Sequence, residues 1–329
     1  MQIPNKSNLF LFDSLINDYQ FYKRSSITHK NNDELEKFFL EARRHSVDMD
    51  IPNTKNQLKQ LIDNVQLTSV GTSPKEKFEI AFSYFIKDFY LSPVYYAIHL
   101  LNMFDENFRK KHVTYIGLEN LFDSINEYGT VILNGLHIDL YQVLLNYISI
   151  LLPNKTLTLF GVEQSLKKIE TINSLYTPFI DNIEYNYLDS LDDKPFPLSF
   201  KKAFRDIKDN KIILIPPEVS MGIGSKVKTN LVGLNVLLPQ GSASLSCKFN
   251  IPVIVTHIVR TDRTNVQITF EKPISPSSDS GNNSVEEQGK LIFKNINEVI
   301  HQYPDTWSGY DVLNYMIDGV YDKEGKFIE

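Results

Sequence analysis

The chain has 329 residues, of which 42% are hydrophobic and 22% charged, and its formal net charge is −6. This composition is typical of a globular protein with one large domain or two ordinary ones. It lacks the basic excess that would indicate a nucleic-acid partner. The one cysteine, Cys247, excludes an intramolecular disulfide and a cysteine-rich metal site.

The first apolar stretch, "NLFLFDSL", is short and is interrupted by Asp13, so it does not read as a signal peptide. No run of about 18 apolar residues predicts a transmembrane helix. We therefore expect a cytoplasmic location, with at most peripheral contact with the inner membrane.

Residues 1–112 read as helical. The segment "SPKE" predicts a helix start, because Ser73 can cap, Pro74 fits the first turn and Glu76 completes a capping box. The many aromatic side chains of this part suit either core packing or the wall of a site for an acyl chain. We expect a helical cap that packs on the rest of the chain.

From residue 113 the pattern changes to strands that alternate with helices, which predicts an α/β domain over residues 113–329 with a mostly parallel central sheet flanked by helices. The expected strands are 130–134, 156–160, 183–188, 211–215, 252–259 and 265–270. The expected helices are 118–127, 138–151, 163–174, 198–209, 241–249 and 285–303. The last helix is expected to begin with a capping box of Ser284 and Glu287.

Two of the expected strands end in residues that can carry chemistry. Asn134 and His137 follow one buried strand, and Glu218 follows the apolar run "IILIPP". Ligands of open α/β sheets bind beyond the carboxyl ends of the strands, where a histidine can act as a general base. Taken alone, a single histidine more often caps a helix or lies satisfied in the core, and a single glutamate more often lies exposed in a loop.

Other chemistries have weak support. Gly-x-Ser-x-Gly is absent, and Cys247 lies inside an expected helix without a nearby histidine, which disfavours a serine or cysteine nucleophile. No metal site is expected, because His137 and Asp139 are only two residues apart and no HExxH motif occurs.

Four segments, taken in order over roughly residues 113 to 313, resemble the lysophospholipid acyltransferase superfamily. The branch is similar to the bacterial lipid A lauroyl/myristoyl acyltransferases and the phosphatidylinositol-mannoside acyltransferases. The segments are "YIGLENLFDSINEYGTVILNGLHIDLYQ", "FKKAFRDIKDNKIILIPPE", "LLPQGSASLSCKFNIPVIVTHIVR" and "INEVIHQYPDTWSGYDVL". The resemblance implies a glycerolipid-acyltransferase-like fold.

The family signature is a histidine with an acid five positions later. His137 matches the histidine, but Gln142 occupies the position of the acid. Two other acids could orient the imidazole. Asp139 is near in sequence, but residues that are two positions apart on a helix do not face each other. Glu218 matches a second acidic position of the family, and we prefer it as the partner of His137.

Two further differences concern the acceptor and the membrane. The segment "LNVLLPQG" lacks the arginine that the family often has before its next helix, and the N-terminal membrane anchor of the lipid A branch has no counterpart. We therefore expect a soluble relative that acts on another acceptor, which could be a small molecule, a peptide or a lipid.

The resemblance implies an acyltransferase that needs no cofactor beyond its donor, an acyl-CoA or an acyl carrier protein thioester. His137 and Glu218 would be catalytic. Backbone N–H groups near His137 or near Gly241 could hold the oxyanion. The expected substrate-binding residues are Asn134, Asp139, Gln142, Gly241 and Ser242. The alternative is a catalytically inactive relative that binds an acyl group or a carrier protein.

Overall fold

The computed structural model describes residues 33–34, 36–38, 40–41, 51–177, 180–188, 198–218, 225–276, 282–317, 320–321 and 327–328. Most of the expected helical cap before residue 51 lies outside these described residues. The first continuous part is helical, as the sequence predicts. Its elements are α3 (Ile51–Leu67), α4 (Pro74–Phe85), the π-helix η1 (Ile86–Leu91), α5 (Ser92–Asn102) and α6 (Glu106–His112).

Helix α4 begins where its sequence predicts. The Oγ atom of Ser73 accepts a hydrogen bond from the N–H of Glu76 at 3.2 Å, and Pro74 occupies the first turn. The Glu76 carboxylate does not close the expected capping box. It accepts hydrogen bonds from the N–H and the hydroxyl of Thr72 instead.

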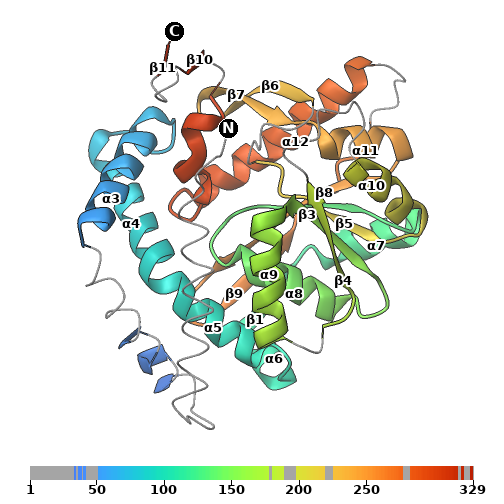
Figure 1. Cartoon of the computed structure of the whole chain (residues 1–329), viewed down its shortest axis with the longest axis horizontal. Coiled ribbons are helices and arrows are strands. Elements are labelled where there is room, and N and C mark those ends of the chain that lie inside the picture. Colours follow the sequence, from blue (N-terminus) through green and yellow to red (C-terminus); the bar gives the residue numbers. More distant parts are fainter. Residues whose placement is uncertain are drawn as a thin grey trace.

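Strands and helices alternate in the rest of the chain (Figure 1). The strands are β1 (Val113–Ile116), β2 (Ile132–Gly135), β3 (Leu157–Val162), β4 (Ile183–Leu188), β5 (Ile212–Leu214), β6 (Lys226–Leu231), β7 (Leu234–Pro239), β8 (Val253–Arg260), β9 (Val266–Phe270), β10 (Val320–Tyr321) and β11 (Phe327–Ile328). The helices are α7 (Leu118–Tyr128), α8 (Tyr141–Leu151), α9 (Glu163–Tyr176), α10 (Leu198–Lys208), α11 (Gly241–Phe249), α12 (Asn282–Gln302) and the 3-10 helix η2 (Ser308–Tyr315).

The central sheet has seven strands in the order β1-β9-β8-β2-β5-β3-β4. Strands β8, β2, β5, β3 and β4 are parallel to one another, whereas β9 runs antiparallel to β8 and parallel to β1. This confirms the predicted α/β fold with a mostly parallel sheet. Because β2 and β5 are parallel neighbours in the middle of the sheet, their carboxyl ends lie side by side. Asn134 lies at the end of β2, and Glu218 follows the end of β5.

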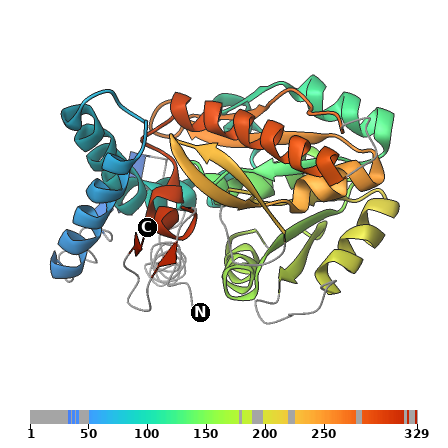
Figure 2. The same cartoon turned by 90° about the horizontal axis from the view of Figure 1, so that it is seen from above.

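Alternating side chains of the buried strands build a separate core on each face of the sheet. Val131 and Leu133 point into one core, which α5, α7, α8 and α9 cover. Ile132, between them, points into the other core, which α10, α11, α12 and the β6–β7 hairpin share with α3 and α4. Figure 2 shows α3 and α4, in blue, at the opposite end of the molecule from α10. The division of the chain into a cap and a domain at residue 113 stays a prediction.

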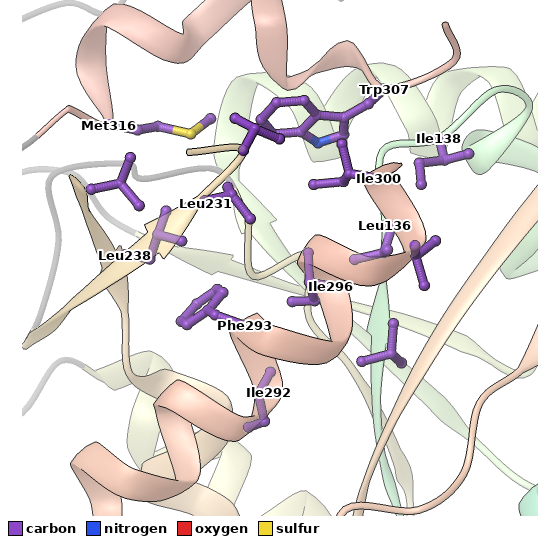
Figure 3. Close-up of a cluster of buried hydrophobic side chains, with 14 of the residues drawn as sticks. Leu136, Ile138, Leu231, Leu238, Ile292, Phe293, Ile296, Ile300, Trp307 and Met316 are labelled. Carbon is purple, nitrogen blue, oxygen red and sulfur yellow. The ribbon is translucent and has the colours of Figure 1, made fainter. Parts of the chain in front are cut away.

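The second core reaches the loop that carries His137. Leu136 and Ile138, which flank His137, are fully buried there with Ile296, Ile300 and Trp307 (Figure 3). Burying an aliphatic side chain of this size stabilises a fold by about 1.5 to 3 kcal/mol. The residues on both sides of His137 are therefore held by the core.

Three local predictions were wrong. Helix α8 begins at Tyr141 rather than at residue 138, because Asp139 has a left-handed backbone (φ 45°) and its N–H bonds to the carbonyl of Thr306. Helix α12 begins at Asn282, so Ser284 lies inside the helix and is not its cap. The β6–β7 hairpin and β1 were not expected as strands.

Candidate active site

The site begins in the loop between β2 and α8. Leu136 and Ile138 are both buried in the core. The side chain of His137 between them is 14% exposed to solvent. The loop after β5 approaches from the neighbouring strand, since β2 and β5 are parallel and paired. It brings the fully buried side chain of Glu218 to His137.

One carboxylate oxygen of Glu218 holds both the backbone and the ring of His137. Oε1 accepts a hydrogen bond from the backbone N–H of His137 and lies 3.0 Å from its Nδ1. An ionised carboxylate only accepts hydrogen bonds, so this contact requires a proton on Nδ1. The neutral ring then carries its lone pair on Nε2, the atom that can take a proton from a substrate.

A segment near residue 307 clamps the same loop from the other side. The carbonyl of His137 accepts hydrogen bonds from the N–H of Ser308 at 2.9 Å and from its Oγ at 3.1 Å. Ile138 and Trp307 form an isolated antiparallel bridge. The backbone of His137 is therefore fixed on both sides.

The carboxylate of Asp139 pairs with Arg260 rather than with His137. Its Oδ1 lies 2.7 Å from Nε of Arg260, and its Oδ2 accepts a hydrogen bond from the backbone N–H of Arg260 at 2.7 Å. Both side chains are almost fully buried, and the guanidinium also lies over the ring of Tyr95. Asp139 thus ties the loop to the end of β8, and a contact with substrate stays a prediction.

The side chain of Gln142 bonds to Tyr141 and not to the imidazole. Its Nε2 donates to the hydroxyl of Tyr141 at 3.2 Å, and its N–H donates to the hydroxyl of Tyr96 at 3.3 Å. Its buried Oε1 has no hydrogen-bond partner among the described residues. The ring of Tyr141 meets that of His137 edge-on at 4.5 Å, and burial raises the pKa of Tyr141 well above its ordinary value. The tyrosine therefore stays neutral and packs against the imidazole.

The other expected site residues meet at the start of α11. Nδ2 of Asn134 donates to Oγ of Ser242 at 2.7 Å and to the carbonyl of Ile215 at 3.1 Å. Gly241 is the first residue of the helix. The end of β2, the end of β5 and the start of α11 are thereby joined next to His137. A common cavity lined by His137, Glu218 and Gly241 stays a prediction.

Sequence reasoning did not select Arg260, Tyr96 or Ser308 for this site. Arg260 had a signal, because a charged residue that ends an eight-residue apolar strand needs a buried partner. Tyr96 and Ser308 had none, since their contacts join segments far apart in the chain. In the part of the chain that the structure describes, no group of three His, Cys, Asp or Glu residues could hold a metal.

One comparison with known proteins indicates a family for this chain. A model of the bacterial lipid A biosynthesis acyltransferase family matches residues 94–308. Among solved structures, the chain is similar to the 1-acyl-sn-glycerophosphate acyltransferase of Thermotoga maritima, with 13% identity over 75% of this chain and 97% of that chain and a TM-score of 0.32. The search of curated proteins finds no significant match.

No helix among the described residues is both long and apolar enough to cross a bilayer. The family model covers well over half of the sequence, including the loop of His137, the acidic turn of Glu218 and the helix that begins at Gly241. This match confirms the resemblance found in the sequence. The chain belongs to the bacterial lipid A biosynthesis acyltransferase family.

Proposed function

We propose that this acyltransferase moves an acyl group from a thioester donor to a hydroxyl or amine acceptor, with His137 as the general base. The observation that carries the proposal is the 3.0 Å contact between Nδ1 of His137 and the buried carboxylate of Glu218. This contact supports an oriented, charge-stabilised imidazole although Gln142 occupies the position of the family acid.

The proposed reaction uses the lone pair of Nε2 of His137. Nε2 takes the proton of the acceptor O–H or N–H while the acceptor atom attacks the thioester carbonyl carbon. The tetrahedral intermediate collapses, the C–S bond breaks, and the imidazolium returns the proton to the thiolate. During these steps Glu218 offsets the positive charge of the ring, as the acid of a catalytic triad does.

The oxyanion of the intermediate needs N–H donors in fixed positions. The start of α11 is the best-supported source, because Asn134 ties Ser242 to the end of β2. Unpaired N–H groups at the start of this helix are attracted to negative charge. The proposal includes both acyl-CoA and an acyl carrier protein thioester as donor.

The second candidate is an inactive relative that binds an acyl group or a carrier protein, and Gln142 is the observation that favours it. Glu218 weakens this candidate, since the imidazole has its carboxylate without position 142. The two candidates differ in one result, the covalent transfer of the acyl group.

The test is intact-mass spectrometry of hydroxyl and amine acceptors after incubation with acyl-CoA and acyl carrier thioesters. We expect an added acyl mass with the unaltered protein and a loss of about 10²–10⁴-fold in rate with His137→Ala. His301→Ala, at an exposed position, is the matched control. Equal rates in His137→Ala and the control would refute the general base. Thioester binding without any transfer would favour the inactive relative.

A further inference from the structure

A polar contact joins the end of β2 to the first turn of α11. Nδ2 of Asn134 donates to the carbonyl of Ile215 at 3.1 Å and to Oγ of Ser242 at 2.7 Å. A carbonyl can only accept a hydrogen bond, so the nitrogen of the amide, and not its oxygen, must face Ile215. The same nitrogen faces Ser242, and Oγ is therefore the acceptor in that hydrogen bond.

The hydroxyl proton of Ser242 is left without an acceptor. A hydroxyl oxygen that accepts a hydrogen bond still has its own proton to donate. Oδ1 of Asn134 does not receive it, because this buried atom has no hydrogen-bond partner. No other acceptor bonds to this hydroxyl in the part of the chain that the structure describes, and Ser242 is only 4% exposed. Because a buried polar group without a partner is unfavourable, a bound ligand is the natural acceptor of this proton.

Backbone donors lie beside this hydroxyl. Helix α11 has nine residues and no side-chain cap, and Ser242 is its second residue. The N–H groups of residues 241–243 have no backbone partner among the described residues. Unpaired N–H groups in the first turn of a helix attract negative charge. The hydroxyl and these N–H groups together suit an oxyanion.

The contact of Asn134 continues the strand pairing that also brings the base to its carboxylate. Strands β2 and β5 are paired in parallel with an offset of 81 residues. The contacts of Asn134 with Ile215 and of His137 with Glu218 keep this offset. Asn134 and His137 are three residues apart, and three residues span at most about 11 Å. The first turn of α11 therefore lies beside the base.

We propose that the hydroxyl of Ser242 is a catalytic donor to the oxyanion of the acyl-transfer intermediate, and that Asn134 is the residue that positions it. The proposal rests on the proposed function and assigns a side chain to its oxyanion site. When the acceptor attacks, the electron pair of the C=O bond moves onto the oxygen, which accepts hydrogen bonds from Oγ and from the N–H groups of α11. The pair returns when the C–S bond breaks, so Ser242 keeps its proton throughout.

The test is the rate of thiol release from decanoyl-CoA by the full chain, with an acceptor that gains an acyl group in the mass-spectrometric test of the proposed function. Ser242→Ala should lower kcat by about 10²-fold and leave KM within about twofold, because an oxyanion donor acts in the transition state. Ser244→Ala, the same substitution two residues later in the same helix, is the matched control. Melting temperatures establish that both variants are folded.

A double-mutant cycle tests the part of Asn134. Asn134→Ala should also lower kcat. Its combination with Ser242→Ala should be little slower than Ser242→Ala alone, because Asn134 acts through the hydroxyl. Ser242→Thr, which keeps a hydroxyl, should retain more of the rate than Ser242→Ala.

An unchanged kcat in Ser242→Ala would overturn the proposal. A raised KM at unchanged kcat would do so too, since Ser242 would then bind the ground state of a substrate. Fully additive losses in the cycle would contradict the part of Asn134. The failure of the proposed function looks different, because His137→Ala would then keep the rate of the unaltered protein. An unaltered protein that transfers no acyl group would overturn both.

Discussion

At the scale of single residues, one carboxylate oxygen of Glu218 contacts both the backbone and the ring of His137. Its Oε1 receives the backbone N–H and lies against the ring nitrogen of His137, so the position and the tautomer of the imidazole depend on the same atom. The second oxygen, Oε2, is buried and has no hydrogen-bond partner among the described residues. Both hydrogen bonds of this carboxylate among the described residues therefore go to His137.

We expect Glu218→Gln to lower the transfer rate by about 10²-fold or more while the fold is kept. The amide can still accept a hydrogen bond, but it gives no charge to stabilise the imidazolium. Initial rates and the melting temperature are the measurements, and the exposed Glu287→Gln is the control. An unchanged rate would mean that Glu218 only supports the loop.

Gln142→Glu places a carboxylate at the family position without bringing it to His137. The side chain bonds to Tyr141 and its oxygen is buried without a partner, so a charge there would be desolvated and uncompensated. We expect a lower melting temperature and no gain in rate. A faster enzyme would show that a carboxylate at this position reaches the imidazole in the working protein.

At the scale of elements, the loop between β2 and α8 is held by the ends of distant elements. The ion pair between Asp139 and Arg260 joins it to β8, and residues 306–308 join it to the segment after α12. The loop has no regular structure of its own, so these contacts set its conformation.

Arg260→Met should destabilise the protein by about 3–5 kcal/mol in urea unfolding, because it leaves the buried charge of Asp139 without its partner. The control is Arg263→Met, whose side chain is 72% exposed. Adding Asp139→Asn to Arg260→Met should recover part of the loss, since asparagine tolerates the left-handed backbone and carries no charge. A double variant that is less stable than Arg260→Met would contradict this account.

The sequence predicts most helices and strands of the domain, because their apolar periodicity agrees with their burial. It does not predict the β6–β7 hairpin, whose turn is Val232-Gly233 with φ values of 49° and 82°. Valine is disfavoured in the left-handed region, so the usual Asn-Gly signal is absent. Tertiary bonds hold this turn, since the N–H of Val232 donates to Asn297 and its carbonyl accepts from Ser69.

The site is predictable to the same extent. His137 and Glu218 each follow an apolar strand, and parallel neighbours bring their ends together. The contacts of Asp139 and Gln142 were not predictable, because they depend on Arg260, Tyr96 and Tyr141 and on the late start of α8. Sequence spacing identifies strand ends, whereas the direction of a loop side chain depends on partners far away in the chain.

At the scale of the whole molecule, both cores contain a buried histidine. Burial lowers the pKa of His99, under α8, to about 3, and that of His257, on β8, to about 4. Both are neutral in the folded protein at mild acidity, where an unfolded chain with a histidine pKa of about 6.5 binds protons. Unfolding therefore takes up protons as the pH falls below that value.

We expect these two histidines to leave the free energy of unfolding unchanged above about pH 6.5. Between about pH 6.5 and 4 the free energy of unfolding should fall by about 1 kcal/mol per pH unit for each histidine. His257→Leu should flatten the decline in urea unfolding measured at several pH values. His301→Leu, at an exposed position, is the control. An identical pH dependence of the two variants would show that His257 is not a source of the decline.

The clamp of residues 306–308 on the loop of His137 has a consequence for the synthesis of the protein. The histidine is translated long before Ser308, whose N–H and Oγ bind its carbonyl. A growing chain could form the sheet and still lack the final shape of this loop until residue 308 has left the ribosome. Acyl transfer would then begin only late in translation, so incomplete chains would not consume donor.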